Sequence, residues 1–293
     1  MANNGNIMKK IQVFGAGFEP SMSSCSNKKP KTFEWTTEYS DNQVLVDRSI
    51  MYSDRLPYLT DGQKRYGWVC ESISIVPDLV ENLIQYSDAI FDFGSFSGIF
   101  TCSEKLLSLN DKFIKCPPVS NLPWISEDGW KIYEKTKNIS MFCSPKKMCE
   151  GHIYRHSVAE KYRDQLDLYG GAFDSPRIGI SENLYEKWND KRDGIADYRF
   201  HLIVENEFEP NFYTEKITDC FATGTVPVYK GCPNIGDYFD ERGIIKYEDG
   251  MDLNTLTDQV YNDMIPFVQN NLELVKNLEM VDDAIAREIF SRQ

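Results

Sequence analysis

The chain is short of the positive charge and the histidines on which nucleic-acid, membrane-surface and metal binding commonly depend. Its 293 residues include 45 aspartates and glutamates against 32 lysines and arginines, and three histidines, so the formal net charge is −13. Such a chain repels nucleic-acid phosphates and anionic membrane surfaces unless it has a local basic patch, and no basic run is longer than Lys28-Lys29 or Lys146-Lys147. We therefore expect no nucleic acid and no membrane surface as a partner, although a few clustered cations can still hold one small anion.

Long apolar runs and paired cysteines are also missing. No stretch approaches the roughly 20 apolar residues that span a bilayer, and the N-terminal residues lack the apolar core of a signal peptide. None of the eight cysteines forms a C-x-x-C pair, and some, such as Cys70 and Cys220, lie in apolar runs, which favours buried free thiols in a reducing compartment. We expect a cytoplasmic chain without a transmembrane segment or a disulfide framework.

Patterns typical of bound metals and dinucleotide cofactors are incomplete. His152 and His156 have helical i, i+4 spacing but lack the glutamate of H-E-x-x-H, and no D-x-D sequence occurs. Gly15 and Gly17 follow a short apolar run as in a dinucleotide fingerprint, yet Pro20 stands in place of the third glycine. We therefore expect no metal and no cofactor, disfavour an NAD-dependent enzyme, and interpret the glycines as a strand-to-loop turn.

The apolar residues that are present predict an α/β protein with two domains. Hydrophobic residues make up 41% of the chain, and its length fits two cores of ordinary size. Short apolar strands alternate with amphipathic helices, which is typical of parallel, doubly wound sheets. The predicted strands are residues 11–14, 44–46, 66–70, 89–93, 138–143, 198–204, 226–229 and 244–245, and the predicted helices are residues 77–86, 151–166, 213–222, 235–239 and most of 253–289.

A change in composition predicts where the two domains meet. Pro117, Pro118 and Pro123 fall in a segment with few periodic apolar residues, which indicates a linker. We expect an N-terminal Rossmann-like domain, a C-terminal Rossmann-like domain and a last helix, over residues 1–132, 133–270 and 271–293.

Polar residues follow the most apolar predicted strand. Glu205 and Asn206 come directly after residues 198–204, so we expect them at the carboxyl edge of a sheet, where α/β proteins bind ligands. The same asparagine also fits an ordinary turn.

A predicted helix begins a few residues later. Thr214 is placed to cap it, Gly224 to stop it, and its first turn holds Glu215 and Lys216. The free N–H groups of a helix start attract phosphate, a lysine adds positive charge, and a glutamate suits a ribose or sugar hydroxyl. Both side chains also fit plain structural roles, one as a favourable charge on the helix dipole and the other as a solvated surface group.

The order of these residues resembles the donor-binding signature of the family 10 α-1,3/1,4-fucosyltransferases. The resemblance runs through Glu205-Asn206 and Thr214-Glu215-Lys216, and then through residues 224–229 and 231–234. It implies a GT-B-like fold, with two Rossmann-type domains whose parallel sheets face each other across a central cleft. It also implies an inverting, metal-independent transfer of fucose from GDP-fucose to a glycan hydroxyl. Phe212 stands where the family usually has tyrosine, and Tyr213 follows it.

The resemblance also implies roles for residues outside this segment. Arg155 matches the family's diphosphate-binding arginine, and its fork suits two phosphate oxygens. Glu71 follows a predicted strand and resembles the proposed catalytic base, with Asp92 and Glu104 as alternative carboxylates. The expected donor-binding residues are Ser144, Arg155, Tyr169, Glu205, Asn206, Phe212, Tyr213, Thr214, Glu215 and Lys216.

Two other functions stay open at this point. One is a glycosyltransferase of the same fold that uses another nucleotide sugar, because no residue reads out fucose by itself. The other is a non-catalytic module that binds a sugar nucleotide or a glycan. Residues 16–65 are expected to supply the acceptor loops, and no sequence feature names the acceptor or the linkage.

Overall fold

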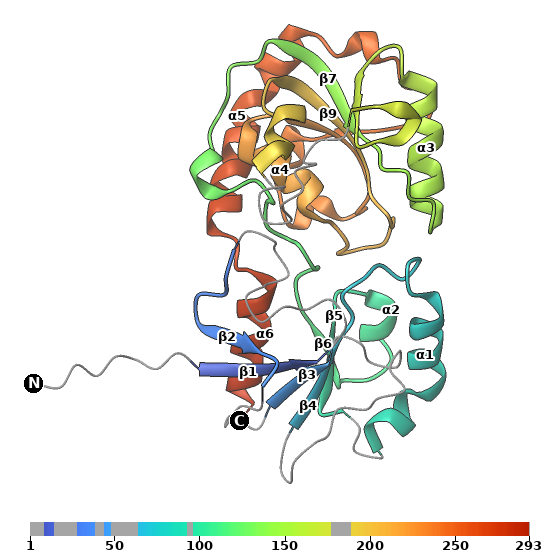
Figure 1. Cartoon of the computed structure of the whole chain (residues 1–293), viewed down its shortest axis with the longest axis vertical. Helices are drawn as coiled ribbons and strands as arrows, with labels where there is room; N and C mark the ends of the chain where they lie inside the picture. Colours follow the sequence, from blue (N-terminus) through green and yellow to red (C-terminus); the bar gives the residue numbers. More distant parts are fainter. Residues whose placement is uncertain are drawn as a thin grey trace, which may run out of the picture. The chain divides into compact units, whose positions relative to one another are not determined.

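The computed structural model describes residues 9–14, 28–38, 44–47, 64–92, 96–176 and 189–292. The chain divides into two compact units, one formed by Met1–Val119 with Glu279–Gln293 and the other by Ser120–Leu278. Each unit is built on its own sheet (Figure 1). The boundary lies after residue 119 instead of 132, and the end of the chain joins the N-terminal unit instead of forming a separate segment.

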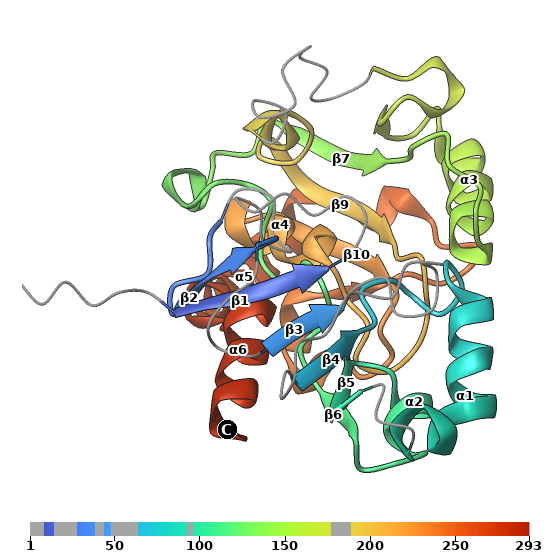
Figure 2. The ribbon, with the colours of Figure 1, turned by 60° about the horizontal axis from the view of Figure 1, so that its bottom comes forward.

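The N-terminal unit is a parallel α/β sheet, as predicted. Its strand order is β2-β1-β3-β4-β5-β6, and every pair of neighbours is parallel (Figure 2). The strands are β1 (Lys9–Phe14), β2 (Phe33–Thr36), β3 (Val44–Asp47), β4 (Lys64–Trp68), β5 (Gly98–Thr101) and β6 (Phe113–Lys115). The helices are α1 (Pro77–Asp92), α2 (Glu104–Leu107) and α6 (Val281–Ser291).

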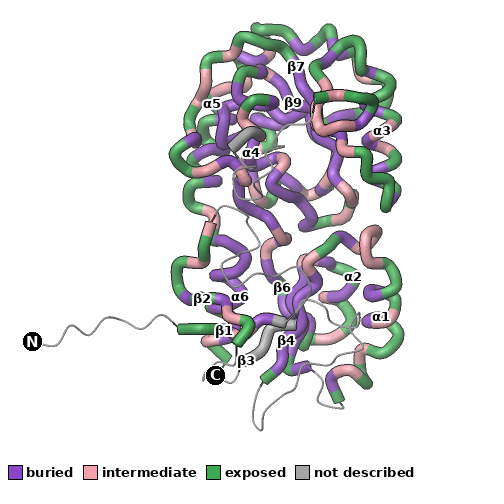
Figure 3. The backbone as a smooth tube through the Cα atoms, in the orientation of Figure 1, coloured by how far each residue is buried: buried purple, intermediate pink, exposed green. Residues whose placement is uncertain are grey.

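Alternating side chains give this sheet two apolar faces. Trp68 and Phe100 pack in one cluster with Ile285 of α6, whereas Ile99 packs in a second cluster with Leu83 of α1. Successive residues of a strand point to opposite faces, so a sheet covered on both sides has near-continuous apolar strands. Figure 3 shows buried residues along β4 and β6 in the N-terminal unit and along β7 and β9 in the C-terminal unit.

Buried carboxylates fasten the last helix to this unit. The carboxylate of Asp283 accepts hydrogen bonds from the backbone N–H of Lys31 (3.0 Å) and of Thr32 (2.9 Å) and from the Thr32 hydroxyl (2.6 Å). Asp282 accepts one from the indole N–H of Trp35 (2.8 Å). Residues more than 245 positions apart are thereby joined at the start of β2.

The predicted strand at residues 89–93 is wrong. Residues up to Asp92 continue α1 past an irregular turn at Tyr86 (φ −119°, ψ 18°), and Phe91 packs edge-on against Phe113 with ring centroids 5.3 Å apart. A short apolar run has the same composition in a buried helix and in a strand, so composition could not separate the two. The actual strand is β5, where Gly98 lies so close to β6 that a Cβ would come within 2.6 Å of the Ile114 side chain.

The C-terminal unit confirms the predicted parallel sheet more closely. Its strand order is β11-β10-β9-β7-β8, and its neighbouring strands are all parallel. The strands are β7 (Lys137–Phe142), β8 (Asp167–Tyr169), β9 (Tyr198–Val204), β10 (Val226–Lys230) and β11 (Ile245–Lys246). The helices are α3 (Glu150–Tyr162), α4 (Glu215–Thr223) and α5 (Asp258–Asn277), with 3₁₀ turns η1 (Glu127–Gly129), η2 (Ala172–Asp174), η3 (Asn189–Gly194), η4 (Ile235–Asp237), η5 (Glu241–Gly243) and η6 (Leu253–Thr255).

The strand order of both sheets reverses after their first strand. The chain runs outward in one direction to β2 or β8, and then in the other direction through β3 or β9. In open α/β sheets, ligands bind beyond the carboxyl ends of the strands at such a switch point. In the C-terminal unit the switch point lies between β7 and β9. In the N-terminal unit the residues that follow β1 and β3, with the Gly15–Pro20 turn and most of the expected acceptor loops, lie outside the described residues.

Candidate functional site

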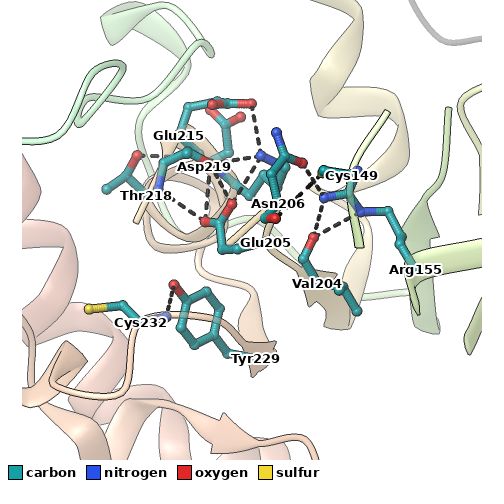
Figure 4. Close-up of polar contacts among 12 residues, drawn as sticks. Cys149, Arg155, Val204, Glu205, Asn206, Glu215, Thr218, Asp219, Tyr229 and Cys232 are labelled. Carbon is teal, nitrogen blue, oxygen red and sulfur yellow. Dashed lines mark hydrogen bonds and ion pairs between the residues drawn. The ribbon is translucent and has the colours of Figure 1, made fainter. Parts of the chain in front are cut away.

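The residues of interest in the C-terminal unit gather at its switch point, after β9 and at the start of α4. Thr214 caps α4 as predicted, since its side chain accepts a hydrogen bond from the N–H of Lys216, and Gly224 ends the helix in the left-handed conformation (φ 70°). Figure 4 shows the polar side chains of this region pointing toward one another.

Glu205 joins the end of β9 to the start of α4. Its carboxylate is fully buried and accepts hydrogen bonds from the backbone N–H of Thr214 (3.0 Å) and from the Thr214 hydroxyl (2.9 Å). The ammonium of Lys216 lies 3.1 Å from the same carboxylate, and 22% of the lysine side chain is exposed. The predicted phosphate ligand Lys216 is thus anchored at the sheet edge and still reaches solvent.

Arg155 clamps the same strand end from α3. Gly151, one turn earlier, approaches β9 so closely that a Cβ would lie 2.4 Å from the carbonyl oxygen of Asn206. Arg155 donates from Nε to the carbonyl of Val204 (2.8 Å), and from Nη2 to that carbonyl and to the side-chain oxygen of Asn206 (2.7 Å). Burial lowers the pKa of Arg155 and Glu205 opposes this, and an arginine in such surroundings stays charged.

The fork of Arg155 is therefore largely used within the protein. The sequence pattern predicted that two guanidinium nitrogens bind a phosphate. In the structure, Nε and Nη2 instead donate to β9 and to Asn206. Its remaining nitrogen, Nη1, forms no hydrogen bond within the described part of the chain. The guanidinium thus keeps one nitrogen and its positive charge for a ligand.

Glu215 pairs with a residue that sequence reasoning missed. Its carboxylate lies 3.1 Å from the ammonium of Lys191 in η3 and 4.0 Å from that of Lys216. Lys191 also lies 2.9 Å from the carboxylate of Asp219. The sequence could have indicated a partner cation, because Glu215 and Asp219 are four positions apart. Two acids at this spacing share one face of a helix and repel each other unless a cation lies between them.

Asp219 anchors this cluster to the start of the C-terminal unit. Its carboxylate is fully buried and accepts hydrogen bonds from the backbone N–H groups of Trp124 (2.8 Å) and Ile125 (3.1 Å). The ammonium of Lys191 lies 4.4 Å from the centre of the Trp124 ring. Three segments that are distant in sequence therefore meet at one lysine.

The cluster shifts the titration of its members. Burial opposes the charge of Lys191, but Asp219 and Glu215 raise the pKa of that ammonium above its usual range. Burial likewise opposes ionisation of Glu215, but Lys191 and Lys216 lower the pKa of its carboxyl to about 2. Burial raises the pKa of Asp219, and Lys191 acts against this rise. Glu215 is consequently ionised throughout the physiological pH range.

The two expected aromatic donor ligands lie in the core. Phe212 and Tyr213 are buried, with 6% and 1% of their surfaces exposed. The Tyr213 ring packs against Tyr238 and Phe239, with centroids 5.0 and 5.3 Å apart. The proposed stacking of a base on either ring is therefore corrected, because neither ring lies at the surface.

The other expected donor residues lie at the ends of β7 and β8. Ser144 is half-buried, and its carbonyl oxygen lies 2.8 Å from Nε2 of His156. The hydroxyl of Tyr169 lies 2.6 Å from that of Tyr198, which donates to Asp167 at 2.7 Å. Ser144 lies at the same sheet edge as Glu205, whereas the hydroxyl of Tyr169 is directed toward Tyr198 at the start of β9, away from that edge, so the donor-binding position expected for Tyr169 is corrected.

The candidate bases lie in the N-terminal unit. Glu71 is exposed and follows the end of β4 by three residues. Glu104 starts α2 and pairs with Lys115 at 3.5 Å, with both side chains more than half exposed. Asp92 ends helix α1, so it does not lie in a strand as the predicted strand at residues 89–93 implied. Glu71 and Glu104 thus each follow a strand by three residues at the carboxyl edge of the sheet, Glu71 after β4 and Glu104 after β5.

Three further features bear on the chemistry. The seven described cysteines are free thiols. In the described ranges, no set of three or more His, Cys, Asp or Glu side chains is arranged to hold a metal ion. None of the helices in the same ranges has the length and apolarity needed to cross a membrane.

The C-terminal unit is similar to a known family of glycosyltransferases. Residues 132–262 match the pattern described as "Glycosyltransferase family 10 (fucosyltransferase) C-term". The "Alpha-(1,3)-fucosyltransferase FucT" of Helicobacter pylori is 20% identical over 191 residues, which are 53% of this chain and 38% of that protein. The "Alpha-(1,4)-fucosyltransferase" of Arabidopsis thaliana is 30% identical over 71 residues, 24% of this chain and 18% of that protein. The matched part of this chain therefore spans well under half the length of either relative.

Solved structures share the fold. A crystal structure of an α1,3-fucosyltransferase with GDP aligns with a TM-score of 0.50 and 16% identity over 97% of this chain and 94% of that chain. A second α1,3-fucosyltransferase structure aligns with a TM-score of 0.50 and 17% identity over 92% of this chain and 84% of that chain. These alignments confirm the predicted GT-B-like α/β fold, and residues 132–262 match the C-terminal part of glycosyltransferase family 10.

Proposed function

We propose that this chain transfers fucose from GDP-fucose to a hydroxyl of a glycan acceptor, with inversion and without a metal or cofactor. The observation that carries the proposal is the cationic edge formed by Arg155, Lys216 and the start of α4, inside a family 10 domain. Free thiols at the seven described cysteines favour the reducing cytoplasm as the place of the reaction.

The donor diphosphate is assigned to this cationic edge. The start of α4 presents backbone N–H groups and the positive end of the helix dipole. Lys216 adds a point charge held 3.1 Å from Glu205, and Arg155 adds a guanidinium held against Val204. Preorganised donors aimed at a developing anion commonly supply about 3 kcal/mol each to catalysis. The cations would stabilise GDP as it leaves, which is the task that a metal performs in other transferases.

The proton of the acceptor hydroxyl is assigned to Glu71. As the acceptor oxygen forms its bond to the anomeric carbon of fucose, the bond from that carbon to the GDP oxygen breaks on the opposite side, which inverts the centre. The O–H proton passes to the carboxylate of Glu71, and the electron pair leaves with GDP. The exposure of Glu71 at the end of β4 supports this role, because an acceptor can reach it.

A titration and a turnover assay test the proposal. Calorimetry in buffer with EDTA should show binding of GDP and GDP-fucose and no response to UDP-galactose, with GDP-mannose as the test of the sugar. Release of GDP from GDP-fucose is then measured with a panel of glycan acceptors. Glu71→Gln should bind GDP-fucose normally and lose about 100-fold or more in turnover, whereas the matched variant Asp92→Asn should keep it.

Other outcomes of these two experiments would favour a different donor, a different function or a different donor site. Selective binding of another nucleotide sugar would retain the fold and replace the donor. Binding of GDP-fucose without turnover on any acceptor would favour a non-catalytic binding module. Failure to bind any of the nucleotides would contradict the roles of Arg155 and Lys216.

A further inference from the structure

The ionic cluster of Lys191, Glu215 and Asp219 is not used by the reaction as proposed above. Lys191 comes from η3 and is not among the residues that the sequence pattern assigned to the donor site. We propose that Lys191 is a positioning residue of the donor site, which holds the carboxylate of Glu215 charged and in one place beside the first turn of α4. This inference rests on the proposed function, because it assumes that the donor binds at that turn.

The position of Lys191 is set by groups that lie away from the donor edge. Asp219, one helical turn beyond Glu215, holds the ammonium at 2.9 Å and is itself held by the backbone N–H groups of Trp124 and Ile125. The Trp124 ring lies 4.4 Å from the same ammonium. A chain of contacts therefore leads from the backbone at residues 124–125 through Asp219 and Lys191 to Glu215.

Lys191 is also the nearest charge to Glu215. The charged groups around Glu215 are Lys191 from η3, Lys216 and Asp219 from α4, Glu205 after β9, and Arg155 from α3. Lys191 lies at 3.1 Å, whereas Lys216 lies at 4.0 Å and is shared with Glu205. Removal of Lys191 would leave a buried carboxylate with one distant, shared cation, and burial would then favour its protonated form.

Stability alone is a weak reason for this cluster. Well-packed apolar side chains stabilise an interior as well as a buried ion pair or better, since both charges must be stripped of water. The cluster keeps the carboxylate of Glu215 ionised at a ligand-binding edge. This arrangement is explained if that carboxylate accepts a hydrogen bond from the bound nucleotide sugar. A charged acceptor strengthens such a bond about twofold over a neutral one.

The dependence of donor affinity on pH distinguishes positioning from mere stability. The probe is GDP-fucose, because its diphosphate is esterified at both ends and does not titrate between about pH 4.5 and about pH 8. The wild-type protein should bind it with nearly constant affinity over this range. Lys191→Met should bind it about tenfold or more weakly at neutral pH, and its affinity should fall further with decreasing pH as Glu215 becomes protonated.

Two single variants control for charge and for stability. Lys191→Arg should restore both the affinity and the flat pH profile, because the cation is retained. Asp219→Asn should unfold at a lower temperature but keep the flat profile, because Lys191 then serves Glu215 alone. If Lys191→Met does not fold, Lys191→Met/Asp219→Asn removes one charge of each sign and should show the same acid loss of affinity.

The outcomes separate this inference from the proposed function. Binding of GDP-fucose by the wild type, with an unchanged pH profile in Lys191→Met and only a lower melting temperature, would overturn the positioning role and leave the function intact. No binding of GDP-fucose by the wild type at any pH would overturn both.

Discussion

Both units are built on parallel sheets, but their buried carboxylates have different kinds of partner. In the N-terminal unit, Asp282 and Asp283 accept hydrogen bonds from neutral donors, namely backbone N–H groups, a hydroxyl and an indole. In the C-terminal unit, Glu205, Glu215 and Asp219 are each paired with a lysine as well. Neutral donors fasten a helix without adding charge, whereas a lysine cluster leaves cations at an edge where an anion can bind.

The carboxyl edges of the two sheets also carry different kinds of side chain. The strands β4, β5 and β6 are followed by Cys70, Cys102 and Cys116, and burial raises the pKa of Cys116 well above its usual value. In the described part of that edge, these thiols lie near Glu71 and the exposed ion pair of Glu104 and Lys115. The C-terminal edge gathers lysines and an arginine instead. The difference matches the proposed division of labour, with the acceptor proton handled by one unit and the donor phosphates by the other.

Loss of Asp219 should have the largest effect. Asp219→Ala removes a partner of Lys191 and the acceptor of two backbone N–H groups, in the interior of the C-terminal unit. We expect the free energy of unfolding of that unit to fall by about 3–5 kcal/mol. Urea denaturation measures the loss, and hydrogen exchange in α4 and residues 120–126 should assign it to this unit. Asp219→Asn keeps an acceptor oxygen and should lose less, and equal losses would contradict the role of the charge.

Acid should weaken the C-terminal unit through Glu215. The pKa of this carboxyl is lowered from 4.5 to about 2 in the folded chain, so its ionised form stabilises the unit above about pH 4.5. This stabilisation is lost as the pH falls through about 4.5 toward about 2, and its full size is on the order of 3 kcal/mol. The difference in unfolding free energy between wild type and Glu215→Gln, measured against pH, isolates the term. A difference that does not shrink in this window would contradict the ion pair.

The neutral anchoring of the N-terminal unit predicts a smaller effect. Asp283→Ala leaves the N–H groups of Lys31 and Thr32 without their acceptor, which should lower the free energy of unfolding of that unit by about 2–3 kcal/mol. Faster hydrogen exchange in β2 and α6, with α4 unchanged, is the expected signature. Asp283→Asn serves as the control, since one amide oxygen can still accept. A loss confined to the C-terminal unit would show that the helix is not fastened here.

Surface ion pairs should matter least. Arg287 pairs with Glu279 at 2.9 Å, with 64% and 44% of the two side chains exposed. Arg287→Ala should change the free energy of unfolding by less than about 1 kcal/mol, because water and salt screen such pairs. Denaturation in low and high salt checks this. A loss as large as that of Asp283→Ala would remove the contrast drawn between buried and exposed acids.

Much of the fold could be predicted from local sequence. The run at residues 198–204 is β9 as expected, Thr214 caps α4, and Gly224 ends it, because caps and buried strands depend on neighbouring residues. The run at residues 89–93 could not be assigned, since the same apolar residues suit the end of α1. The place of the last helix also could not be predicted, because its contacts to β2 span more than 245 positions.

The sequence by itself determined the identities and the order of the site residues. Glu205, Thr214 and Lys216 follow one strand and open one helix, so chain connectivity alone brings them together. Only the tertiary structure decided how their charges are compensated. Lys191 reaches Glu215 from 24 residues away, and Arg155 reaches β9 from 49 residues away. The energy of a charge inside a protein depends on the distance and burial of its partners, which the order of residues does not state.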